Sequence, residues 1–353
     1  MSDILSKTIA NIQPLDRNSM EKAKARQDTL TKPTGSLGRL EELSVQIAGI
    51  QGKPLPQIKN KAVIVMAADH GVATRGTSAY PQEVTAEMVL NFLHGGAGIN
   101  VISRQVGARV IIVDMGVAVK LESNPDLISR RIAAGTQDMS QGPAMSVIQA
   151  EQAVGAGIEI VTAEVKKGLD IVATGDMGIG NTTASSAICA VMTGKTVAEV
   201  TGRGTGLDDR QLQQKISIIS ESIALNRPQS AKPLETLAKV GGFEIGGLAG
   251  VILGAAANRI PVVIDGFISG AAALIAAGLC PQSRDYMIAG HCSVEPGHKI
   301  ILQHLGLKPL LDLEMRLGEG TGAALAVSVA EASVRILDEM ATFEEAGVAE
   351  KGE

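Results

Sequence analysis

The chain has 353 residues and a formal net charge of −5, and its lysines and arginines form no long run. It has no tryptophan, two tyrosines and four phenylalanines, so aromatic platforms for single-stranded nucleic acid are scarce. This composition argues against nucleic acid or an anionic membrane as the main partner and favours a small-molecule ligand.

The cysteines and the amino terminus indicate the compartment. Cys189, Cys280 and Cys292 lie far apart without CxxC spacing, which suits a reducing environment and predicts neither a disulfide framework nor a zinc site. No cationic segment leads into an apolar stretch at the amino terminus, so we expect no signal peptide. The longest apolar stretch, Gly266 to Cys280, is too short and too rich in glycine to cross a bilayer and predicts a buried helix. We therefore expect a cytoplasmic protein without membrane insertion.

The two ends of the chain share an amphipathic helical pattern. Residues 1–27 and 327–353 lie outside the strand and helix alternation of residues 28–326. We expect the two ends to pack together as a small helical domain beside a large α/β catalytic domain of residues 28–326.

Short apolar runs rich in β-branched residues predict strands, and each leads into a glycine-rich turn and a helical pattern. Continuous apolar strands of this kind are typical of a parallel sheet covered on both faces, so the fold class is α/β with a doubly wound, Rossmann-like sheet. Ligands of such sheets bind beyond the carboxyl ends of the strands. The predicted strands are Lys61–Ala67, Arg109–Val113, Leu169–Thr174, Pro261–Ile264 and Asp285–Ile288.

The first of these strands ends in Asp69 and His70, before a long loop. An Asp–His pair is typical of metal binding or acid–base chemistry, and equally of a hydrogen-bonded pair that orders a loop. Both interpretations stay open.

Two capping-box patterns predict helix starts between the strands. Ser146 with Gln149 opens a long periodic segment that ends at Gly168, and Thr196 with Glu199 repeats the pattern.

The loop G-D-M-G-I-G-N-T-T, residues 175–183, follows a strand and opens a helix at Ala184 to Thr193. Its glycines allow backbone amides to approach an anion, while Asn181, Thr182 and Thr183 can cap the helix and donate to a phosphate. A plain glycine turn with a good cap explains the pattern equally well. The loop is neither a P-loop nor a dinucleotide fingerprint.

A second glycine loop, T-G-R-G-T-G-L-D-D, precedes a helix that begins near Asp208 and carries Lys215. Lys215 is a candidate for binding the same phosphate, although a lysine on a helix usually belongs to a solvated face.

The stretch H-C-S-V-E-P-G-H places His291, Glu295 and His298 at spacings that would share one helical face. Pro296 and Gly297 are poor residues for a helix interior, so we assign no metal site.

Near the carboxyl end, Glu319 lies between Gly318 and Gly320. Burial among apolar neighbours would raise its pKa toward useful basicity, whereas an exposed position near a helix N-terminus would lower it. The sequence leaves these two interpretations open.

Taken together, these stretches resemble the nicotinate-nucleotide:dimethylbenzimidazole phosphoribosyltransferase family of the cobalamin nucleotide-loop pathway. The resemblance extends over nearly the whole chain and implies a homodimer, no cofactor and a catalytic glutamate at Glu319. The matching stretches are K-P-T-G-S-L-G-R-L-E at 32–41, A-D-H-G-V at 68–72, G-P-A-M-S at 142–146, the loop at 175–183, K-V-G-G-F at 239–243, I-D-G-F at 264–267 and R-L-G-E-G-T-G-A-A-L-A at 316–326.

The resemblance also implies a set of substrate-binding residues. Asp176 stands where some relatives carry Glu, and Met88 where some carry Gln, which affects the expected range of acceptors. The residues implied for the nucleotide are Gly178, Gly180, Asn181, Lys215 and Ser293, and the region from Tyr80 to Met88 is implied for the acceptor base. We also expect Thr182 and Leu317 to bind substrate.

The implied reaction moves the 5-phosphoribosyl group of nicotinate mononucleotide to a benzimidazole-type base. We expect Glu319 to remove a proton from the base and Asp176 to stabilise positive charge at C1′. Two other functions are weighed against it: a pyrophosphate-dependent phosphoribosyltransferase, suggested by V-V-I-D-G-F-I-S-G at 262–270, and a protein that binds a nucleotide without converting it. The first lacks a second adjacent acid because Gly266 occupies that place. A Rossmann oxidoreductase lacks its fingerprint after the first strand.

Overall fold

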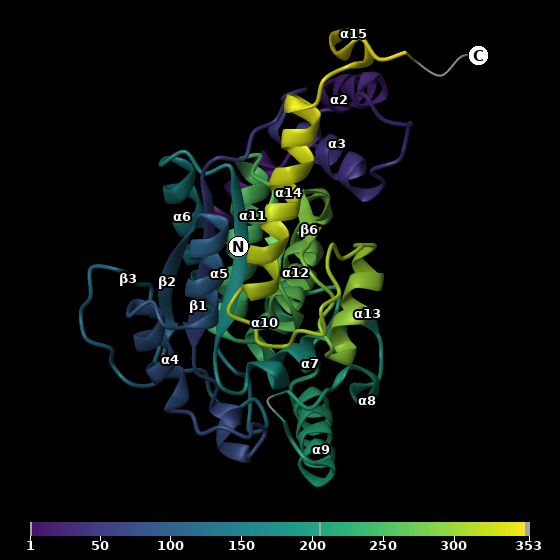
Figure 1. The fold of residues 1–353 in the computed structure, drawn as a ribbon. Helices are drawn as coiled ribbons and strands as arrows, with labels where there is room; N and C mark the ends of the chain where they lie inside the picture. Colours follow the sequence, from purple (N-terminus) through teal and green to yellow (C-terminus); the bar gives the residue numbers. More distant parts are fainter. Residues whose placement is uncertain (1, 205, 350–353) are drawn as a thin grey trace.

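The computed structural model describes residues 2–204 and 206–349 (Figure 1). These residues form a six-stranded sheet in which every neighbouring pair of strands is parallel. The order β3-β2-β1-β4-β5-β6 reverses between β1 and β4. The predicted doubly wound α/β architecture is confirmed. The strands are β1 Lys61–Ala68, β2 Ala108–Gly116, β3 Leu127–Ser129, β4 Ile171–Met177, β5 Val262–Ile264 and β6 Met287–Ala289.

Five of these strands coincide with the predicted apolar runs. The sequence did not predict β3, which has three residues, none of them buried, and which pairs only with β2 at the edge of the sheet. A strand that buries neither face needs no apolar run, so it carries no strong sequence signal.

Helices cover both faces of the sheet (Figure 1). The two 3₁₀ segments are Gly71–Arg75 and Pro281–Tyr286. The α-helices are α1 Asp3–Asn11, α2 Arg17–Thr29, α3 Arg39–Gln51, α4 Val84–Leu93, α5 Gly98–Val106, α6 Val147–Val165, α7 Asn181–Thr193, α8 Val197–Val200, α9 Asp209–Asn226, α10 Pro233–Val240, α11 Phe243–Ala257, α12 Phe267–Leu279, α13 Pro296–Leu305, α14 Thr321–Glu339 and α15 Phe343–Ala346.

Strand β1 explains why the apolar runs are continuous. Ile64 and Met66 point to the core made with α6, α11 and α12, while Val63 and Val65 point to the core made with α3, α4, α5 and α14. Successive side chains alternate between two buried faces, so residues 62–68 are all apolar and only Lys61, at the start of the strand, is charged.

Both predicted capping boxes are present, with Ser146 and Gln149 at the start of α6 and Thr196 and Glu199 at the start of α8. The predicted buried helix from Gly266 is α12, whose residues are mostly buried. Within the described part of the chain, no helix has the length and hydropathy needed to span a membrane.

The helices near the chain ends divide between two places. Helices α2 and α3 pack against the end of α14, where Ala23, Ala48 and Leu337 form a small core and the Arg26 side chain donates to the Leu337 carbonyl. Figure 1 shows α14 running from the sheet to α2 and α3. Helix α1 contacts α6 and α11 instead. The division of the chain into two domains stays a prediction.

Helices α6 and α11 approach each other closely through glycine. A methyl group added at Gly157 would overlap the carbonyl oxygen of Gly247, and one added at Gly250 would overlap the carbonyl oxygen of Val154. The packing of α6 against α11 on this face of the sheet therefore depends on these small residues.

We expect Gly157→Ala to destabilise the fold by about 1–3 kcal/mol because the added methyl group forces the two helices apart. The matched control is Gly155→Ala on the same helix, where the methyl group would meet only Ile4 at an ordinary 3.5 Å. That control should be neutral or stabilising, by up to ~1 kcal/mol, because alanine favours helix more than glycine does. Urea unfolding of both variants measures the difference, and equal stabilities would contradict the close packing.

Candidate active site

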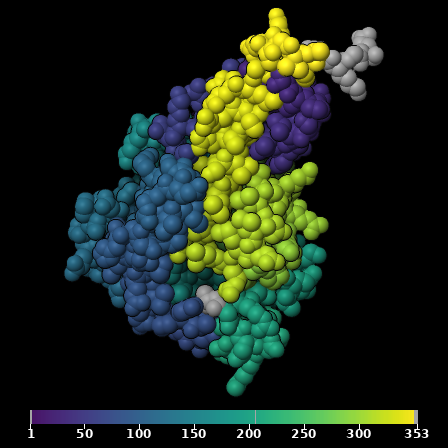
Figure 2. Space-filling model, in the orientation of Figure 1, coloured from purple at the N-terminus to yellow at the C-terminus, as the bar shows by residue number. Residues whose placement is uncertain are grey.

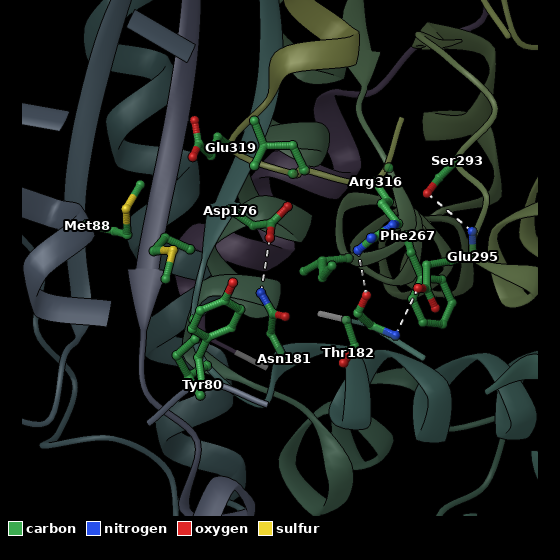
Figure 3. A pocket seen from close by; sticks show the side chains of 18 of the residues that line it. Tyr80, Met88, Asp176, Asn181, Thr182, Phe267, Ser293, Glu295, Arg316 and Glu319 are labelled. Atoms are coloured by element: carbon green, nitrogen blue, oxygen red, sulfur yellow. Dashed lines mark hydrogen bonds between the residues drawn. The ribbon is translucent and has the colours of Figure 1, made fainter. Parts of the chain in front are cut away.

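A cavity of about 370 Å³ opens where the strand order reverses, lined by residues that follow β1, β4, β5 and β6. Figure 2 shows the surface hollowed between the blue segment after β1 and the yellow-green segment around residues 290–320. In Figure 3, Tyr80, Met88 and Glu319 lie toward one end, Phe267 and Ser293 toward the other, and Asp176 between them. Glu295 and Arg316 lie on the same side as Ser293, so this end of the cavity is richer in polar groups. The other end is more apolar, apart from the Glu319 carboxylate.

The turn that carries Glu319 has an unusual backbone. Gly318, Glu319 and Gly320 have φ angles of +80°, +62° and +91°. The left-handed region costs a residue with a side chain about 1–2 kcal/mol, so this conformation persists only because the surroundings hold it. One such contact is with β4, since a methyl group added at Gly175 would overlap the carbonyl oxygen of Glu319.

The Glu319 carboxylate is 5% exposed, and its Oε2 accepts a hydrogen bond of 3.0 Å from the backbone N–H of Ile99 in the first turn of α5. Burial raises the pKa of Glu319, the Ile99 amide lowers it, and the negative charge of Asp265 raises it again, so the pKa lies above its ordinary value. The sequence left two effects on the pKa of Glu319 open, burial and a nearby helix N-terminus, and both are present. Burial has the larger effect, and the helix is α5 rather than the one that follows Glu319.

Asp176 lies at the end of β4 in the centre of the cavity. Its Oδ2 accepts a hydrogen bond of 3.0 Å from Asn181, and its Oδ1 has no hydrogen-bond partner among the described residues. Burial raises the pKa of Asp176 well above its ordinary value, and the charges of Asp265 and Glu244 add to this effect. A positively charged ligand beside Asp176 would favour the ionised carboxylate.

The predicted glycine loop forms the floor of the cavity and opens α7. A methyl group added at Gly178 would overlap the Ala68 carbonyl oxygen, so the loop lies directly on the end of β1. Gly178, Asn181 and Thr182 line the cavity, whereas Gly180, with φ +94°, faces His70 and Ala73 below it. The N-terminus of α7 therefore opens into the cavity, as an anion site requires.

Lys215 is 1% exposed rather than part of a solvated helix face. Its Nζ donates a hydrogen bond of 2.7 Å to Thr182 Oγ1, so it stands one side chain behind the lining of the cavity. Burial lowers the pKa of Lys215 to about 8, although the Glu295 carboxylate opposes this. The helix is α9, Asp209–Asn226, with Asp208 as its N-cap, so it begins near Asp208 as expected.

The cavity has further polar residues that sequence reasoning did not assign to a site. The Arg316 guanidinium donates to the carbonyl of Gly204 at 3.1 Å, and the amide of Gly204 donates to Glu295 Oε1 at 3.0 Å. His291 also lines the cavity. Their residue types gave no local signal, because each contact joins positions about a hundred residues apart.

Glu295 does not share a helix face with His291. It is the residue before α13, which has Pro296 as its first residue, so His291 lies outside that helix. His298 is inside α13 and accepts a hydrogen bond of 3.0 Å from the Ser293 amide. In residues 2–204 and 206–349, no cluster of three or more His, Cys, Asp or Glu side chains has the geometry to hold a metal ion.

Asp69 and His70 order the loop after β1. His70 Nε2 lies 2.7 Å from Glu244 Oε1, and Asp69 Oδ2 accepts from the Ala118 amide at 2.7 Å. Burial lowers the pKa of His70, but the Glu244 carboxylate outweighs it and raises the pKa. Neither residue lines the cavity, and each is hydrogen-bonded to a distant segment of the chain rather than to the other.

Nine of the eleven predicted site residues line this one cavity. Two lie behind the lining: Gly180 under the loop and Lys215 behind Thr182. The nine that line it are Tyr80, Met88, Asp176, Gly178, Asn181, Thr182, Ser293, Leu317 and Glu319.

The chain is similar to known proteins over its whole length. A family described as Phosphoribosyltransferase matches residues 12–348. A nicotinate-nucleotide–dimethylbenzimidazole phosphoribosyltransferase from Desulforudis audaxviator (strain MP104C) is 62% identical over 348 residues, and one from Roseiflexus sp. (strain RS-1) is 64% identical over 350 residues. Each alignment covers 99% of both chains.

A solved structure has the same fold. The crystal structure of CobT from Thermus thermophilus superimposes with a TM-score of 0.92 at 45% sequence identity, and the match covers 95% of this chain and 100% of that one.

Proposed function

The chain belongs to this phosphoribosyltransferase family, and we propose that it transfers the 5-phosphoribosyl group of nicotinate mononucleotide to 5,6-dimethylbenzimidazole. The products are α-ribazole 5′-phosphate, used in cobalamin lower-ligand synthesis, and nicotinate. The observation that carries this proposal is one cavity with an apolar end that also holds Glu319, a polar end at the N-terminus of α7, and Asp176 between them.

The polar end suits the nucleotide. Its phosphate would lie at the N-terminus of α7, near Thr182 and Ser293, with the Lys215 ammonium close behind. A dianionic phosphate would favour the charged form of Lys215 and so offset the effect of burial on its pKa.

The apolar end suits a flat heterocycle. Tyr80, Met88 and Leu317 would hold the acceptor beside the Glu319 carboxylate. Such a position places the acceptor N–H within reach of a buried base whose pKa is raised by its surroundings.

The reaction then needs one bond to form, one to break and one proton to move. The free ring nitrogen of the acceptor attacks C1′, and the bond from C1′ to nicotinate breaks. Its electron pair returns to the pyridinium nitrogen, whose positive charge is thereby removed. Glu319 accepts the proton from the other acceptor nitrogen, so the product base stays neutral. Holding both bases at C1′ supplies much of the remaining acceleration.

The ionisation of Asp176 depends on the charge of the bound ligand. The pyridinium ring of the bound nucleotide would favour its ionised form, because a nearby cation opposes the effect of burial. The carboxylate then stabilises the positive charge that develops at C1′ as nicotinate departs.

We also propose a homodimer and a cytoplasmic location. The family resemblance supports the first, and three cysteines without a disulfide among them support the second. Sedimentation equilibrium of the purified chain should give about twice the protomer mass of 36.5 kDa. A single species at the protomer mass would contradict the dimer.

We expect Glu319→Gln to keep nucleotide binding and to lower kcat by about 10²–10⁴, the usual range for loss of a general base. Because the pKa of Glu319 is raised, wild-type kcat should fall on the acidic side at a pH above the ordinary carboxylate range, as the base form becomes protonated. Glu87→Gln, an exposed acid on α4, is the control. Steady-state kinetics across pH test this, and wild-type turnover in Glu319→Gln would remove Glu319 from the role.

We expect Lys215→Ala to raise the Michaelis constant for the nucleotide by roughly 10–100-fold, the range for losing a hydrogen bond to a charged group. Removal of the ammonium should affect kcat less, because Lys215 lies far from the acceptor end. Lys24→Ala, at an exposed position of α2, is the control. An unchanged Michaelis constant would argue against a phosphate near Lys215.

A further inference from the structure

Asp265 is a fully buried carboxylate next to the cavity that the proposed reaction does not use. It follows β5 directly, in the I-D-G-F stretch. Its Oδ1 accepts a hydrogen bond of 2.8 Å from the Ala323 amide, and its Oδ2 has no hydrogen-bond partner among the described residues. Burial raises the pKa of Asp265, whereas His291 and the nearby amides of Ala323, Gly320 and Gly322 lower it. Ala323 lies in the first turn of α14, so Asp265 binds one of the amides that a helix normally leaves without a partner.

The helix has no such partner of its own. The residue at its N-cap is Gly320, which offers no side chain to accept such a hydrogen bond. An ionised carboxylate also interacts favourably with the positive end of a helix. Asp265, at the end of β5, therefore caps α14 from a distant part of the chain.

The capped turn is the one that presents Glu319. Glu319 precedes the N-cap by one residue and holds a left-handed backbone with φ +62°. Close packing limits the turn on other sides, since a methyl group added at Gly322 would overlap the His291 ring. The charge-assisted hydrogen bond that the Asp265 carboxylate accepts from the Ala323 amide helps to fix the direction in which the turn leaves the helix.

Asp265 is itself held in place. Its amide donates to Thr174 Oγ1 at 3.2 Å, and that hydroxyl donates to the Val263 carbonyl at 3.2 Å. His291 Nε2 lies 3.7 Å from Asp265 Oδ1. The backbone of Asp265 is thus tied through Thr174 to two neighbouring strands, and its carboxylate faces a histidine that lines the cavity.

We propose that Asp265 is a positioning residue of the transfer reaction: it binds the first turn of α14 and so fixes the Glu319 side chain against the acceptor. This inference rests on the proposed role of Glu319 as the base. Asp265 touches neither substrate in this scheme and acts through Glu319 alone.

The charge of Asp265 has a second effect. It raises the pKa of Glu319, and the other titratable groups around these two acids are Asp176 on β4, Glu244 on α11 and His291 after β6. Asp265→Asn keeps an oxygen that accepts from the Ala323 amide but removes the charge. The pKa of Glu319 should then fall, and the acidic limb of kcat should move to lower pH.

The test is a double-mutant cycle with Asp265→Ala, Glu319→Gln and the double variant in the full-length chain. We expect Asp265→Ala to lower kcat by about 10²-fold, the effect of a 1 Å misplacement of a catalytic group, with little change in the Michaelis constant for the nucleotide. The double variant should be no slower than Glu319→Gln. Asp265→Asn should retain more turnover than Asp265→Ala and should show the shifted acidic limb.

Asp170→Ala is the matched control, because Asp170 Oδ2 also accepts two backbone amides, from Lys59 and Asn60, at the amino end of the sheet. It should keep wild-type turnover. If Asp265→Ala keeps normal kcat while Glu319→Gln loses it, the inference is wrong and the proposed function stands. If the two losses add in the double variant, Asp265 does not act through Glu319. Wild-type turnover in Glu319→Gln would overturn both.

Discussion

The site depends on a three-residue left-handed turn, Gly318 to Gly320, pressed against the end of β4. Only glycine fits at Gly175 beneath it, because any side chain there would overlap the Glu319 carbonyl. As a result of this turn, the Glu319 carboxylate lies in the lining of the cavity. A conformation of this kind is strained for Glu319 and is stable only within the folded sheet, so the chemistry of the residue is inseparable from the packing of β4, β5 and α14.

Buried negative charge is the second constraint on this site. Asp265, Glu244 and Glu319 lie close enough to raise the pKa of Asp176, and Asp265 also raises the pKa of Glu319. Glu244 has the His70 imidazole as a partner, and Asp265 accepts a hydrogen bond from the Ala323 amide. Asp176 accepts a hydrogen bond from the neutral Asn181 amide, and its Oδ1 has no partner among the described residues, so a cationic ligand can interact with it. A nucleotide with a cationic ring suits such a cavity better than a neutral one does.

Local patterns predicted the scaffold well because each depends on neighbours in sequence. Continuous apolar runs gave the central strands, and the capping boxes at Ser146 and Thr196 gave helix starts. The burial of Lys215 depends on Thr182, 33 positions away, and no local pattern reports such a partner. The same holds for Glu295 and Arg316, which meet through the backbone of Gly204. The edge strand β3 was missed because it buries neither face.

The position of Asp265 also separates this site from a pyrophosphate-dependent one. An acid at the end of a strand can bind a metal that carries pyrophosphate, but here Asp265 Oδ1 accepts the Ala323 amide of α14, and Gly266 follows where a second acid would be needed. A pyridinium leaving group loses its positive charge as it departs and needs no partner of that kind. In the proposed reaction the strand-end acid therefore organises the backbone, and Glu319 is the residue proposed to accept the proton.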